Sequence, residues 1–79
     1  MGNKEKLLES AKSSAKNFKF NDLIKLAEAH GFVFKRQKGS HVMMKHKVES
    51  IFMNFQDKNG KAKPYQVKQL LEAIDEYNL

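Results

Sequence analysis

A chain of 79 residues is long enough to bury one modest hydrophobic core and too short for two. With 41% hydrophobic residues, 30% charged residues and a single proline, the composition is typical of a folded domain and excludes a disordered tail. The absence of cysteine excludes disulfides and thiolate chemistry, and a formal net charge of +6 favours an anionic partner, either nucleic acid or an acidic protein surface.

The first half of the chain predicts two helices. Residues 4–16 carry apolar side chains at helical spacing, which indicates a short amphipathic helix. We interpret this helix as an accessory element that covers an edge of the core, with an arm that contacts a partner or RNA as the alternative. The second helix is expected over residues 21–31, where Asn21 and Asp22 favour a start and Gly31 a stop.

The second half predicts three strands and a final helix. The strands are expected at residues 32–37, 41–47 and 50–56, and their short connections favour an antiparallel meander. Residues 57–63 are expected to form a polar loop, and a helical apolar stripe follows over residues 64–77. The sequence therefore predicts an α+β fold in which helices cover one face of a three-stranded antiparallel sheet.

Candidate functional chemistry is concentrated in residues 35–47. This stretch holds five cationic side chains, no acidic one and two of the three histidines. His41 directly follows the Gly39-Ser40 turn, and an imidazole can gain or lose a proton near neutral pH. Arg36, Lys38 and Lys45 are expected to lie near His41 and to bind phosphate oxygens. A solvated basic face with an ordinary surface histidine is the alternative interpretation.

Strand alternation separates the two histidines of this stretch. His41 and Lys45 should point to one face, whereas Val42, Met44 and His46 should point to the other, with Val42 and Met44 in the core. The two histidines are therefore not expected to form a catalytic pair or a metal site.

A family resemblance rests on these same residues. The run from Gly31 through Arg36-Gln37-Lys38-Gly39-Ser40-His41, followed by Lys63-Pro64 and an apolar helix, resembles the HicA toxins of bacterial and archaeal toxin-antitoxin pairs. The similarity covers residues 18–79 and leaves residues 1–17 as an added accessory helix. It implies a double-stranded-RNA-binding-domain-like fold, an mRNA interferase activity and inhibition by a HicB-like antitoxin protein.

The resemblance also implies which residues act. The family's catalytic histidine falls on His41, and its preceding glycine and serine on Gly39 and Ser40. We expect cleavage of mRNA without a metal or other cofactor, through attack of a ribose 2′-hydroxyl on the adjacent phosphorus. Arg36, Lys38 and Lys45 would bind and polarise the phosphate, and Gly39 would allow close approach of the backbone.

Two other functions stay open from the sequence. One is a non-catalytic RNA-binding module of the double-stranded-RNA-binding type, which would need no histidine at a special position. The other is a domain whose basic face docks an acidic protein partner. No apolar run approaches the roughly 20 residues of a membrane span, and the first residues lack the apolar region of a signal peptide, so we expect a cytoplasmic protein.

Overall fold

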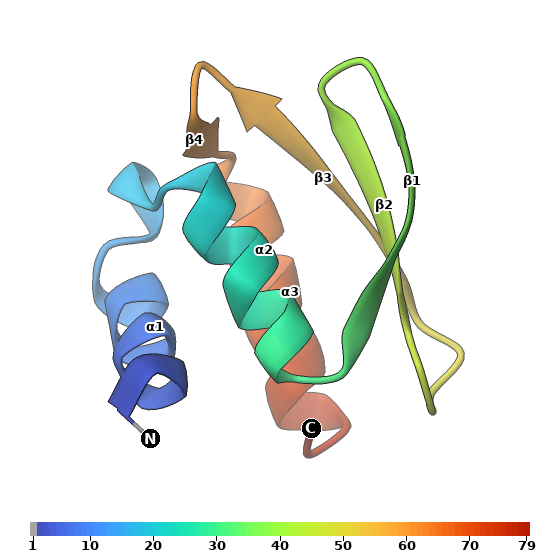
Figure 1. Cartoon of the computed structure of the whole chain (residues 1–79). Coiled ribbons are helices and arrows are strands. Elements are labelled where there is room, and N and C mark those ends of the chain that lie inside the picture. The colour runs from blue at the N-terminus through green and yellow to red at the C-terminus, as the bar shows by residue number, and fades with distance from the viewer. Residues whose placement is uncertain (1) are drawn as a thin grey trace.

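Helices and strands occupy separate layers of the molecule (Figure 1). The computed structural model describes residues 2–79, and side chains are described from residue 5 onward. The elements in chain order are α1 (Gly2–Ser13), a 3-10 turn η1 (Ala15–Asn17), α2 (Phe20–Ala29), β1 (Phe32–Lys38), β2 (His41–His46), β3 (Phe52–Lys58), β4 (Lys61–Ala62) and α3 (Pro64–Glu76). The predicted α+β class is confirmed, with the bounds of the elements displaced by a few residues.

The sheet is antiparallel, with its strands in the order β1-β2-β3-β4, and the helices lie on one side of it (Figure 1). Its inner face packs on α2 and α3. The largest fully buried side chains come from both layers: Phe32, Phe55, Leu23, Leu26, Met44, Leu70 and Val67. Burying these side chains together stabilises the two layers against each other, and the outer face of β1 to β3 is left uncovered by helices.

A fourth strand was not predicted. Lys61–Ala62 form β4 and pair with the end of β3, in a segment where the sequence was expected to form a loop. Asn59 and Gly60 both have positive φ, at 55° and 84°, as a two-residue turn of type I′ requires. An Asn-Gly pair is a strong hairpin signal, so the strand could have been predicted from the sequence. Asp57 strengthens the turn by accepting a hydrogen bond from the Gly60 amide at 2.7 Å.

The predicted alternation along β2 is confirmed. Val42 and Met44 are buried in the core and His46 is also buried, whereas His41 is exposed. His41 therefore points to the outer face of the sheet, and His46 points to the helices.

The N-terminal helix packs against other helices. Ala11 of α1 is fully buried, and Leu7 and Leu8 pack against the core. The neighbours of α1 are α2 and α3, on the side away from the sheet (Figure 1). This helix thus extends the helical layer and packs on the core through Leu7, Leu8 and Ala11.

Candidate functional site

The tight turn between β1 and β2 places His41 at one end of the exposed sheet face. Lys38 and His41 are paired across the two strands, so only Gly39 and Ser40 form the connection. Gly39 has a φ of 60°, which glycine adopts without the steric cost that a Cβ would impose. The turn therefore holds His41 at the first position of a strand, with its side chain in solvent.

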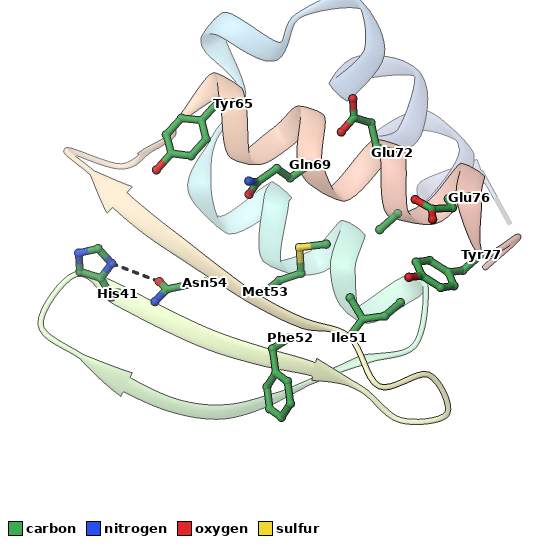
Figure 2. Close-up of a pocket in the computed structure, with 11 residues that line it drawn as sticks. His41, Ile51, Phe52, Met53, Asn54, Tyr65, Gln69, Glu72, Glu76 and Tyr77 are labelled. Atoms are coloured by element: carbon green, nitrogen blue, oxygen red, sulfur yellow. Dashed lines mark hydrogen bonds between the residues drawn. The ribbon is translucent and has the colours of Figure 1, made fainter.

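Asn54 is the hydrogen-bond partner of His41. The His41 Nδ1 atom lies 3.2 Å from the amide Oδ1 of Asn54 on β3 (Figure 2). Because an amide oxygen only accepts hydrogen bonds, the contact requires a proton on Nδ1, and in the neutral imidazole the lone pair is then on Nε2. An imidazole in this tautomer, held by its other nitrogen, can accept a proton from a bound molecule.

A cleft on the outer face brings His41 together with several of the predicted residues. Its lining consists of Arg36, Gln37, Lys38, Gly39, His41, Met43 and Asn54, and includes no carboxylate. Two cations and a proton acceptor therefore share one open site. This arrangement suits a phosphodiester, because the cations can offset the charge of its oxygens.

Arg36 and Lys38 reach this face because of a β-bulge. The pairing of β1 with β2 shifts between Phe34 and Arg36, which adds one residue, Lys35, to the β1 side. Phe34 pairs with Met44 of the core face, whereas Arg36 pairs with Met43 of the outer face. Without the extra residue, strict alternation would turn Arg36 toward the helices.

Two of the predicted site residues lie outside the cleft lining. The Lys45 ammonium lies over the Phe52 ring, 5.7 Å from its centroid, farther along the outer face. Ser40 is in the turn, where its Oγ accepts a hydrogen bond from the side-chain amide of Gln56 at 3.4 Å. Of the predicted residues, the structure groups only Arg36, Lys38 and Gly39 directly with His41.

His46 has a structural role. It is only 6% exposed, its Nδ1 accepts hydrogen bonds from the amides of Val48 and Glu49, and its Nε2 donates to the carbonyl of His30 at 2.9 Å. Its ring also packs edge-on against Phe32. Both ring nitrogens are therefore occupied by backbone groups, and the lone pair is unavailable to a substrate.

No local pattern in the sequence predicts the contact of Asn54 with His41. Its side chain alternates with those of Phe55 and Met53, which predicts an outward direction, but its contact with His41 depends on the register of β3 against β2. That register pairs Asn54 with Met43 and places it diagonally across from His41.

A second depression extends from the same histidine in another direction. It runs between β3 and α3, with His41 and Asn54 at one end, and Figure 2 shows Tyr65, Gln69, Glu72, Glu76 and Tyr77 of the α3 region along its upper wall. The exposed Glu72 and Glu76 make this wall acidic. A phosphate chain would therefore be favoured on the Arg36 side of His41 and disfavoured along α3.

Comparisons with known proteins identify the family. The model of the HicA toxin of bacterial toxin-antitoxin systems matches residues 20–75, from the start of α2 to near the end of α3. Comparison with curated proteins and with solved structures gave no significant match. Among the described helices none is both long and apolar enough to cross a bilayer. The matched residues cover α2, the four strands, most of α3 and the whole lining of the His41 cleft. The chain therefore belongs to the HicA family of toxins, known as mRNA-cleaving toxins that act with a cognate antitoxin.

Proposed function

We propose that this protein is an endoribonuclease that cleaves mRNA by transesterification, with His41 as its catalytic residue. The observation that supports the proposal most strongly is the solvent-facing imidazole, oriented by Asn54 through Nδ1 and flanked by Arg36 and Lys38. A proton acceptor next to two cations is what attack on a phosphodiester requires.

In the proposed reaction, Nε2 of His41 takes the proton of a ribose 2′-hydroxyl. The oxygen attacks the adjacent phosphorus, the bond from phosphorus to the 5′-oxygen breaks, and the leaving oxygen gains a proton from water. The products are a 2′,3′-cyclic phosphate and a 5′-hydroxyl. Arg36 and Lys38 offset the charge that develops on the phosphorane oxygens, and Gly39 leaves room for the sugar-phosphate chain. Ser40 and Lys45 contact the RNA on either side of the cleft.

We propose that the reaction needs no metal. The support is the chemistry of the cleft, whose lining offers cations, amides and one imidazole instead of the carboxylates that hold Mg²⁺. Within residues 5–79, three or more histidine, aspartate or glutamate side chains are nowhere grouped as a metal site would need.

A HicB-like antitoxin would inhibit the toxin by covering the His41 cleft, and the mRNA substrate places the reaction in the cytoplasm. The catalytic domain would comprise residues 18–79, with residues 1–17 as an accessory helix, which agrees with a family match that begins at residue 20.

The purified protein is expected to cleave single-stranded RNA in the presence of EDTA, and mass spectrometry of the products should find 2′,3′-cyclic phosphate ends. Products ending in 3′-hydroxyl groups would contradict the mechanism. Binding of duplex RNA without any product would instead favour a non-catalytic RNA-binding module.

Expression of the protein alone should also arrest growth, and co-expression of its antitoxin should restore it.

A separate prediction concerns RNA binding by the two cations of the cleft, Arg36 and Lys38. The double variant Arg36→Gln/Lys38→Gln should bind RNA more weakly, and the slope of log affinity against log salt should decrease by about 1.4, because each lost phosphate contact to a single strand contributes about 0.7. The binding is measured in a His41→Ala background so that the RNA stays intact. The control is Lys25→Gln/Lys68→Gln, which removes the same charge from exposed positions on α2 and α3. Equal slopes for the two double variants would rule out a specific role of the cleft.

A further inference from the structure

The outer face of the sheet continues well beyond the His41 cleft. The register of β1, β2 and β3 aligns its outward side chains in three rows. The rows are Lys38-His41-Gln56, Arg36-Met43-Asn54 and Val33-Lys45-Phe52. The proposed catalytic residue is in the first row, and the third row lies at the opposite end of the same open surface.

Phe52 is one of two exposed aromatic side chains of the sheet and lies on its outer face, whereas the other, Phe34, pairs with Met44 of the inner face. Phe32 and Phe55 are fully buried, whereas Phe52 is 61% exposed. Figure 2 shows its ring pointing away from α3, on the opposite side from Met53 and Ile51. The nearby Lys45 ammonium lies 5.7 Å from the ring centroid. An exposed ring with an adjacent cation forms a platform on which a nucleic-acid base can stack while its phosphate meets the ammonium.

The charge of the outer face favours an anionic ligand. All three rows contain a cation, namely Lys38, Arg36 and Lys45, and none of the nine side chains in them is acidic. The depression between β3 and α3, which Phe52 also borders, has Glu72 and Glu76 of α3 on its far wall. An anionic chain bound at His41 would therefore be guided across the sheet face toward Lys45 and the outward side of the Phe52 ring, and away from the acidic side chains of α3.

We propose that single-stranded RNA crosses the outer face from His41 to Phe52, with one base stacked on the Phe52 ring and its phosphate at Lys45. This inference rests on the proposed function and adds the path of the substrate. Lys45 follows His41 by four positions along β2, which is about 13 Å, or about four nucleotides at the stacked rise of about 3.4 Å. Unpaired bases can turn toward an aromatic ring, whereas those of a duplex are already stacked, so a single strand is required.

The test compares two phenylalanines on opposite faces of the same sheet. Phe52→Leu removes the aromatic ring and keeps an apolar side chain, and Phe34→Leu makes the identical change at a 54% exposed position that pairs with Met44 of the inner face. Both are made in a His41→Ala background, and affinity for a fluorescein-labelled RNA of about ten nucleotides is measured by anisotropy. We expect Phe52→Leu to weaken binding about tenfold, as is typical for loss of one stacked base, and Phe34→Leu to have no effect.

A fluorescence experiment tests the stacking contact directly. The chain contains two tyrosines but no tryptophan, so Phe52→Trp introduces a single tryptophan at the platform, whose emission is excited separately from that of the tyrosines. Single-stranded RNA should quench its emission, and Phe34→Trp should show no quenching. If neither Phe52 variant responds to RNA differently from its Phe34 counterpart, the proposal is wrong, whether or not the wild-type protein cleaves RNA. A loss of antitoxin binding with unchanged RNA binding in Phe52→Leu would also overturn it, because the platform would then be a protein interface.

Discussion

Replacing His41 with alanine is expected to lower the rate of RNA cleavage by about 100- to 10,000-fold, the usual contribution of a general acid or base. The physical reason is that the proton acceptor is removed while the cations of the cleft stay in place. His41 is exposed and makes one side-chain hydrogen bond, to Asn54, so the thermal unfolding temperature should be unchanged. Single-turnover cleavage of a labelled oligonucleotide measures the rate, and circular dichroism measures the unfolding.

Two further variants separate proton transfer from other effects. His41→Gln places an amide near Asn54 but cannot transfer a proton, so it should be as inactive as His41→Ala. Asn54→Ala keeps the imidazole but removes the hydrogen bond that orients it. A smaller loss of activity is therefore expected, mainly in kcat rather than KM, together with a changed dependence of kcat on pH. Retention of wild-type cleavage in His41→Ala would refute the assignment of the catalytic residue.

Replacing Gly31 with alanine is expected to destabilise the fold by at least about 3 kcal/mol, a large share of the roughly 5–15 kcal/mol typical of a domain. Gly31 has a φ of 96°, which a residue with a Cβ adopts at a steric cost. A Cβ at this position would also collide with the Nε2 atom of His46. The imidazole would have to move and would lose its hydrogen bond to the His30 carbonyl, which would leave buried polar groups unpaired.

The matched control is Gly60→Ala. Gly60 also has a positive φ, 84°, but a Cβ there would meet nothing within 4 Å. We expect this variant to lose only about 1–2 kcal/mol, the cost of left-handed backbone. Urea denaturation measures both free energies of unfolding. If the two variants lost equal stability, the packing of His46 against Gly31 would contribute nothing beyond backbone strain.

Much of the architecture could be predicted because its signals are local. The apolar stripe of α3, the stop signal at Gly31 and the alternation of β2 each depend on residues that are neighbours in the sequence. The hairpin at Asn59-Gly60 carries an equally local signal: the polar composition of the segment favours a loop, but the turn chemistry of the Asn-Gly pair allows β4 to form.

The sequence alone determined that the chain forms helices on one face of an antiparallel sheet, and that His41 points away from the core while His46 points into it. Tertiary structure decided which side chains join His41. The bulge in β1 turns Arg36 and Lys38 to the outer face, and the register of β3 brings Asn54 to the imidazole. The physical reason is that alternation acts along a single strand, whereas a bulge and a register result from pairing between strands that the local sequence does not specify.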